Sequence, residues 1–94
     1  MVKIIWSNHF FIKTTEICDY ISKESLEYAS KFLTLLQTNI TNLEKFPKIG
    51  RIVPERNVDE LRELILGNYR IIYHLNDDFI ELITIIHSKQ RFGL

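Results

Sequence analysis

The clearest pattern in the chain is a helical repeat of apolar positions between Ser25 and Pro47. Apolar residues recur there every three or four positions, as they do along the buried side of an amphipathic helix. These positions are Ala29, Phe32, Leu33, Leu36, Ile40 and Leu43. Ser25 is a favourable N-cap residue, and Pro47 ends the helix at or before Phe46. This segment is therefore predicted to be a long helix that packs on a core.

A less regular helical repeat precedes it. Its apolar positions are Phe10, Ile17 and Ile21, with Phe11, Thr14 and Cys18 beside them. Thr14 stands where a larger aliphatic residue would be expected. Ser7 or Asn8 is the predicted N-cap, and the β-branched and aromatic residues of Val2–Trp6 predict a short strand before it. Since residues 22–24 leave only a short connection, the two helices are predicted to form an antiparallel hairpin.

The stretch Leu61–Tyr73 predicts a β-hairpin. Gly67-Asn68 suits the positive φ angles of a two-residue turn, which pairs Leu66 with Tyr69. One face then carries Arg62, Leu64, Leu66, Tyr69, Ile71 and Tyr73, and the other carries Leu61, Glu63, Ile65, Arg70, Ile72 and His74. The first face is mostly apolar and is expected to pack on the core. The second places Arg70 among apolar neighbours, with Glu63 on the diagonal.

A last strand is predicted at Phe79–His87, after the turn residues Asn76, Asp77 and Asp78. With an even number of residues in the connection, the face shared with Arg70 would carry Glu81, Ile83, Ile85 and His87. An odd number would move His87 to the apolar face. We expect the even connection, because it leaves Glu81 out of the core.

These elements predict one domain over residues 1–94 of the α+β class. It would contain an N-terminal strand, an antiparallel helical hairpin and a three-stranded antiparallel β-meander, with the helices covering one face of the sheet. The connection Pro47–Glu60 contains two prolines and Gly50. It is long for a loop in a compact domain, and loops of this kind are often functional.

Composition narrows the class of protein. Twelve basic residues balance twelve acidic ones, which argues against a broad surface that follows a nucleic-acid backbone. The single cysteine, Cys18, excludes an internal disulfide and favours the cytoplasm. No membrane span or signal peptide is expected. His9, His74 and His87 lack metal-ligand spacing, and no glycine-rich phosphate loop is present, so we expect neither a metal nor a cofactor.

Several short motifs, in order, resemble the RelE/ParE toxins of bacterial type II toxin–antitoxin systems. They are Trp6-Ser7, Ile17-Cys18-Asp19-Tyr20-Ile21, Ala29 with Phe32, Phe46-Pro47-x-x-Gly50-Arg51-x-Val53-Pro54-Glu55, Leu61-Arg62-Glu63-Leu64, Tyr69-Arg70-Ile71-Ile72-Tyr73 and His87-Ser88-x-x-Arg91. Each motif alone is weak, and their order and spacing together are specific. Asn8 and Thr14 depart from the proline and leucine that are common in the family.

The resemblance implies a small toxin that a cognate antitoxin neutralises, and that reaches DNA only through this antitoxin. ParE-like members inhibit DNA gyrase and are not enzymes, whereas RelE-like members enter the ribosome and cut mRNA. The loop motif, Leu61–Leu64 and the neutral charge favour the ParE branch. A ribosome-dependent endonuclease is the second hypothesis. An inactive member that only binds an antitoxin is the third.

If the protein were a nuclease, the resemblance would assign three residues to the reaction. Arg70 would stabilise the phosphate, Glu55 would act as the base, and His87 would act as the acid. The alternative is structural: Arg70 pairs with Glu63 or Glu81, Glu55 is solvated, and His87 is an ordinary residue at a strand end. The structural alternative for Arg70 is favoured, because unpaired arginines within sheets are rare.

Binding roles are assigned to two further groups. Candidate target-binding residues are Arg51, Arg56, Arg70, Lys89 and Arg91. For Arg51 and Arg56, contact with the target or the antitoxin and simple solvation are equally consistent with the sequence, and a solvated tail is the alternative for Lys89 and Arg91. An apolar groove beside Phe10, Phe11 and Phe32 is the predicted antitoxin site, because exposed aromatic residues mark partner sites.

Overall fold

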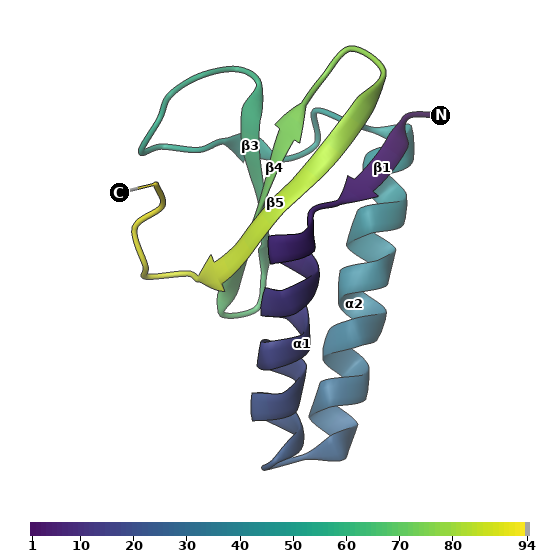
Figure 1. The fold of residues 1–94 in the computed structure, drawn as a ribbon, viewed down its shortest axis with the longest axis vertical. Helices are drawn as coiled ribbons and strands as arrows, with labels where there is room; N and C mark the ends of the chain where they lie inside the picture. Colours follow the sequence, from purple (N-terminus) through teal and green to yellow (C-terminus); the bar gives the residue numbers. More distant parts are fainter. Residues whose placement is uncertain (94) are drawn as a thin grey trace.

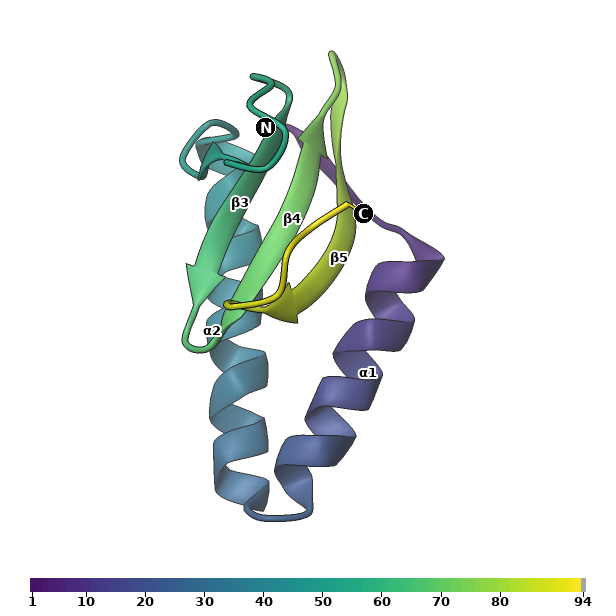
Figure 2. The ribbon, with the colours of Figure 1, turned by 90° about the vertical axis from the view of Figure 1, so that its left-hand side faces the viewer.

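The structure is a computed structural model that describes residues 1–93. It contains a five-stranded sheet in the order β1-β5-β4-β3-β2, with a helical hairpin on one face (Figure 1). Figure 2 shows α2 running behind β3 and β4, while the C-terminal segment crosses in front of the sheet. The predicted α+β fold, with an N-terminal strand, a helical hairpin and an antiparallel meander, is confirmed. No helix among residues 1–93 is long and apolar enough to cross a membrane.

The N-terminal strand and first helix form as the sequence predicts. Strand β1 (Lys3–Trp6) pairs in parallel with β5 (Phe79–His87) at one edge of the sheet. Ser7 is the N-cap of α1 (Asn8–Ser22), since its Oγ accepts a hydrogen bond from the backbone N–H of Phe10 at 3.0 Å. Ser7 therefore joins the end of β1 to the start of α1.

The second helix, α2 (Leu26–Lys45), also has the predicted limits. Ser25 caps it by accepting a hydrogen bond from the backbone N–H of Tyr28 at 3.1 Å. The predicted apolar positions are buried in the core except Leu33, whose side chain is 46% exposed. Leu33 lies at the border of the apolar stripe, where it lines a small hollow with Trp6.

The central hairpin has the predicted register. Strands β3 (Leu61–Leu66) and β4 (Tyr69–Leu75) pair Leu66 with Tyr69, Leu64 with Ile71 and Arg62 with Tyr73. Gly67 adopts a φ of 58°, which a residue without a side chain adopts at little cost. The sequence did not predict the two-residue strand β2 (Arg51–Ile52), which pairs with β3 at the second edge.

A β-bulge in β5 changes the predicted faces of that strand. The even connection is confirmed at its start, where Glu81 pairs with His74, but Ile83 is then left without a partner opposite it. From Thr84 onward, each residue of β5 therefore lies on the opposite face of the sheet from the one predicted. The prediction that Ile85 and His87 share a face with Arg70 is therefore wrong, and Thr84 and Ile86 take those places.

The bulge is held from outside the strand. The hydroxyl of Ser7 donates a hydrogen bond to the carbonyl oxygen of Ile83 at 3.0 Å, and its backbone N–H donates to Leu82 at 3.1 Å. The N-cap of α1 thus stabilises the irregular point of β5. This link between residues far apart in the chain lies beyond any local sequence pattern.

Two apolar clusters cover the two faces of the sheet. The larger one lies between the helices and the sheet, and its buried members are Phe10, Phe32, Leu36, Ile40, Leu43, Leu66, Ile71, Tyr73, Ile80, Leu82 and Ile85. The smaller one comprises Val53, Leu61 and Ile72, with Ile83 and Phe92 packed against it. It lies on the face that carries Arg70, so this face is covered by the long loop and the C-terminal segment.

Thr14 offers a simple test of core packing. Its side chain is buried in α1, and its hydroxyl has no hydrogen-bond partner among the described residues. Thr14→Val keeps the shape and removes the unpaired hydroxyl, so we expect about 1 kcal/mol of added stability and a higher melting temperature by circular dichroism. Thr15→Val is the control, because the Thr15 hydroxyl is exposed and donates to Phe11 at 3.0 Å. A melting temperature for Thr14→Val at or below that of the wild type would contradict this account.

Candidate functional site

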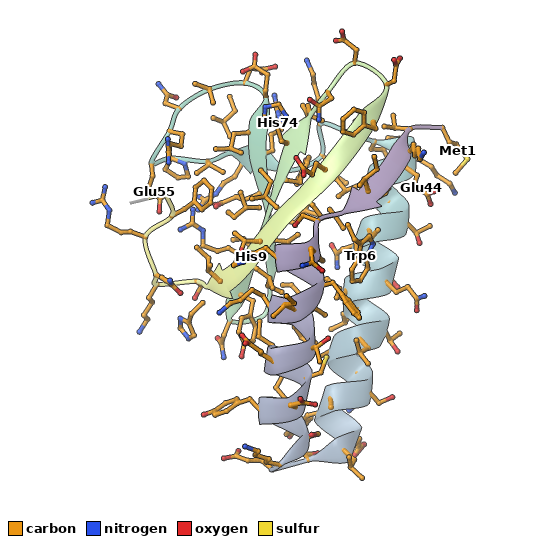
Figure 3. All side chains as sticks on the ribbon, viewed as in Figure 1. Met1, Trp6, His9, Glu44, Glu55 and His74 are labelled. Carbon is orange, nitrogen blue, oxygen red and sulfur yellow. The ribbon has the colours of Figure 1, made fainter. Side chains whose placement is uncertain are left out.

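Four charged side chains form a connected network on the sheet face opposite the helices. We call it the Arg70 network, and its members are Arg51, Glu55, Glu63 and Arg70. Arg51 lies on β2, Glu63 on β3, Arg70 on β4, and Glu55 in the loop between β2 and β3. Figure 3 shows Glu55 in this loop, on the far side of the sheet from Trp6 and beside the C-terminal segment.

The guanidinium of Arg70 donates four hydrogen bonds, and its Nη2 atom also contacts Glu63. Nε donates to Glu63 Oε1 at 2.7 Å, and Nη2 also lies against this oxygen. Nη1 and Nη2 donate to the two oxygens of Glu55, both at 2.8 Å, in the bidentate geometry typical of strong arginine–carboxylate pairs. The remaining Nη1 hydrogen is donated to the backbone oxygen of Gln90 at 2.9 Å.

The carboxylate of Glu63 lies at the centre of the network. Its side chain has no exposed surface, and its second oxygen accepts a hydrogen bond from Arg51 Nε. The strand register explains this position. Arg51 on β2 is paired directly with Glu63, and Arg70 on β4 lies diagonally across from Glu63. A buried carboxylate is costly unless it is paired, and here two arginines pair with it.

The pKa of the Glu55 carboxyl is held well below its usual range. The main cause is the pair of hydrogen bonds from Arg70, followed by the hydrogen bond that the backbone N–H of Phe92 donates to Oε2 at 3.0 Å. The same contacts raise the pKa of Arg70 further above its usual value, with Glu55 as the largest cause. Both groups are therefore charged across the physiological range.

An open hollow of about 390 Å³ lies beside the network. Its lining comprises Arg51, Pro54, Glu55, Arg70, Ser88 and Arg91. The structure thus brings together three of the candidate target-binding residues, Arg51, Arg70 and Arg91. The other two lie outside the lining: Arg56 donates to the backbone oxygen of Gly93 at 2.7 Å, and Lys89 is exposed.

The three residues of the nuclease hypothesis do not converge. Arg70 and Glu55 are in contact, but His87 pairs with Tyr69 and points to the opposite face of the sheet. Its Nδ1 accepts a hydrogen bond from the backbone N–H of Lys89 at 3.2 Å, and its ring centroid is 6.0 Å from that of Tyr69. The structural alternative for Arg70 is confirmed for Glu63. The expectation of a solvated Glu55 is wrong, because its side chain is only 15% exposed.

The aromatic residues of the predicted antitoxin site differ in exposure. Phe10 and Phe32 are buried in the core, so the exposure on which their assignment rested is wrong for both. Phe11 is 51% exposed on α1. Phe10 lies on the side of α1 that faces the sheet, and Phe11 does not. The helical repeat in the sequence does not by itself show which side of α1 faces the sheet.

Sequence reasoning missed the role of Tyr73. Its hydroxyl donates to the backbone oxygen of Pro47 at 2.9 Å and accepts from the backbone N–H of Gly50 at 2.9 Å. Tyr73 thereby fixes the start of the long loop against β4. The only signal in the sequence was a hydroxyl on the core face of the hairpin, which needs a partner when buried.

Comparisons with known proteins identify the family. A model of the family described as "ParE toxin of type II toxin-antitoxin system, parDE" matches residues 4–92. The chain is 29% identical over 92 residues to a Sinorhizobium fredii protein described as "Putative toxin Y4kP", covering 96% of this chain and 92% of that protein. A chain of a solved structure, "Chromosomal ParDE TA system from P. aeruginosa", shares the fold with a TM-score of 0.75 at 18% identity, covering 95% and 98% of the two chains. The chain therefore belongs to the ParE toxin family of type II toxin–antitoxin systems.

Proposed function

We propose that this toxin acts in the cytoplasm as a non-enzymatic inhibitor of DNA gyrase, and that a cognate antitoxin neutralises it by binding. Inhibition would come from contact between the toxin and gyrase, with no bond made or broken by the toxin. The alternative within the same superfamily is a ribosome-dependent mRNA endonuclease.

The observation that carries the proposal is that the guanidinium of Arg70 is bound to other groups of the toxin itself. Four of its N–H groups donate to Glu55, Glu63 and the backbone oxygen of Gln90, and Nη2 also contacts Glu63. An arginine that stabilises a phosphate in a transition state must have donors free to point at it. Because all three nitrogens of the Arg70 guanidinium already donate to these partners and His87 lies on the other face, the arrangement supports binding over RNA cleavage.

Exposed apolar side chains on the two helices support the antitoxin part of the proposal. Phe11 and Tyr20 on α1, and Tyr28 and Leu35 on α2, are each more than half exposed. Large apolar side chains in water are characteristic of surfaces that bind partners. The antitoxin would cover these residues, on the layer opposite the Arg70 network.

The test is a supercoiling assay with purified gyrase and relaxed plasmid. We expect the toxin to reduce supercoiling in proportion to its concentration, and equimolar antitoxin from the adjacent gene to restore it. In parallel, primer extension on mRNA translated with the toxin should show no new cuts in codons at the ribosomal A site.

Two results would overturn the proposal. Unchanged supercoiling at a large excess of folded toxin would exclude gyrase inhibition. Toxin-dependent cuts in translated mRNA would establish the endonuclease in its place.

A further inference from the structure

The C-terminal segment over residues 88–93 is held at alternating positions by hydrogen bonds to a turn, a strand and a loop. The backbone N–H of Ser88 donates to Asn68 at 2.7 Å, the backbone oxygen of Gln90 accepts from Arg70, and the backbone N–H of Phe92 donates to Glu55. The anchors at 88, 90 and 92 therefore use every second residue. Figure 2 shows this segment crossing the face of the sheet opposite the helices.

The end of the segment is anchored by side chains as well. The Phe92 ring packs against the cluster of Val53, Leu61 and Ile72, and the guanidinium of Arg56 lies 5.6 Å from the ring centroid. Arg56 also donates to the backbone oxygen of Gly93. Contacts of both kinds make this segment a fixed part of the surface.

The positions between the anchors carry cations. Lys89 and Arg91 are exposed, and neither forms an ion pair with a carboxylate within residues 1–93. Arg91 and Arg51 line the hollow, and the Arg51 side chain is 63% exposed even though it contacts Glu63. Side chains that are held in place by their backbone lose less entropy when they bind.

We infer that residues 88–92 form a preorganised ledge that binds carboxylate groups on the surface of the toxin's protein target, through Lys89, Arg91 and the exposed side of Arg51. Arg70 and Glu55 are positioning residues in this arrangement, because they hold the ledge and do not touch the partner. The inference deepens the proposed function and rests on it for the identity of the target.

Charge favours carboxylates over a nucleic-acid backbone. Glu55 lines the hollow with three arginines, and Glu63 lies directly behind it. The excess of positive charge around the hollow is therefore small, while binding to a nucleic-acid backbone depends on many cations along the contact. A few carboxylates of a protein surface match Lys89, Arg91 and the exposed side of Arg51.

The position of the ledge favours the target over the antitoxin. The exposed apolar residues proposed for the antitoxin lie on the helices, whereas the ledge lies on the other face of the sheet. Two separate surfaces would allow each partner its own contacts.

The first experiment measures fluorescence anisotropy of a labelled oligoglutamate peptide and of a labelled single-stranded DNA oligonucleotide. Wild-type toxin should bind the peptide, and its affinity should fall as salt is added, because exposed ion pairs are screened. K89Q/R91Q should bind about tenfold more weakly, since each exposed ion pair contributes a few-fold. K13Q/K31Q is the matched control: it removes the same charge from two lysines already paired on the helices, and its affinity should be unchanged.

Three results would overturn the ledge. One is the absence of peptide binding by the wild type. Another is equal binding by the two double variants. The third is tighter binding of the oligonucleotide than of the peptide through the same two residues, which would make the surface a nucleic-acid site.

The second experiment separates the ledge from gyrase inhibition. In the supercoiling assay, K89Q/R91Q should need about ten times the wild-type concentration for half inhibition. If the wild type fails to inhibit gyrase while the peptide binds at the ledge, gyrase is the wrong target, and the proposal that the ledge binds carboxylates is retained. If the wild type and K89Q/R91Q inhibit equally, gyrase inhibition stands and the ledge is not the contact. If instead K89Q/R91Q loses antitoxin binding but not gyrase inhibition, the ledge belongs to the antitoxin.

Phe92→Ala tests preorganisation without changing any charge. It removes the ring that packs against Val53, Leu61 and Ile72, and it leaves the charged side chains of Lys89 and Arg91 unchanged. We expect faster hydrogen–deuterium exchange over residues 88–92 and about threefold weaker peptide binding. Faster exchange with unchanged affinity would show that fixing the segment is irrelevant to binding.

Discussion

Replacing Arg70 with methionine is expected to lower the free energy of unfolding by about 3–5 kcal/mol. The substitution leaves the fully buried carboxylate of Glu63 with Arg51 as its only cation among residues 1–93, and it leaves Glu55 without its bidentate partner. Methionine fills much of the same volume, so the loss is electrostatic more than steric. Urea unfolding followed by circular dichroism measures the change.

Arg51→Met is the matched control for this prediction. Arg51 contacts the same carboxylate, but its side chain is 63% exposed, so the expected loss is about 1 kcal/mol or less. The double variant E63L/R70M should recover about half of the loss from Arg70→Met, because it no longer buries an unpaired charge. Equal destabilisation by Arg70→Met and Arg51→Met would show that burial does not set the strength of these ion pairs.

The Arg70 network also predicts the dependence of stability on pH. The pKa of Glu55 is depressed in the folded state by its hydrogen bonds from Arg70 and Phe92. In the unfolded chain a glutamate titrates near pH 4.3. Below that pH the unfolded chain binds more protons than the folded one, so stability is complete above about pH 5 and falls as the pH is lowered. In Arg70→Met the main cause of the shift is gone, and urea midpoints should vary less between about pH 5 and pH 3.

Gly50→Ala is the second substitution with a large expected effect. An added Cβ would stand 2.5 Å from the backbone oxygen of Glu63 and 2.6 Å from the hydroxyl of Tyr73. The loop would have to move away, which breaks the hydrogen bond from Gly50 to Tyr73 and disturbs the pairing of β2 with β3. We expect a loss of about 3 kcal/mol in the free energy of unfolding.

Gly67→Ala separates close packing from backbone conformation. No atom of the described residues 1–93 lies within 4 Å of a Cβ added at Gly67, so the expected cost comes from its φ of 58° and is about 1 kcal/mol. In thermal melts, the melting temperature of Gly50→Ala should therefore be well below that of Gly67→Ala. The reverse order would mean that the contact between Gly50, Tyr73 and β3 is not tightly packed.

The Arg70 network was predicted in part. The hairpin register follows from Gly67-Asn68 and the period of two, which place Arg70 and Glu63 on one face. Arg51 and Glu55 joined the network only in the structure, because they lie on a loop that contains prolines and a short edge strand. Local periodicity says nothing about where such a loop folds back.

The position of His87 shows a different limit. The even number of residues in the turn before β5 was inferred correctly, and a single bulge at Ile83 then reversed the face of every later residue. The bulge is stabilised by Ser7, a residue that the sequence identifies only as a helix cap. A bulge that is stabilised by a distant residue cannot be predicted from the alternation of apolar and polar residues within the strand itself.

By itself, the sequence determined the two helices and their caps, the central hairpin and its register, and the resemblance to the RelE/ParE toxins. These features depend on residues close together in the chain, where caps, turns and periodicity act. Tertiary structure alone decided that Phe10 and Phe32 are buried while Phe11 is exposed, that His87 faces away from Arg70, and that the C-terminal segment lies across the sheet. Each of these depends on contacts between distant segments, which form only when the whole chain packs.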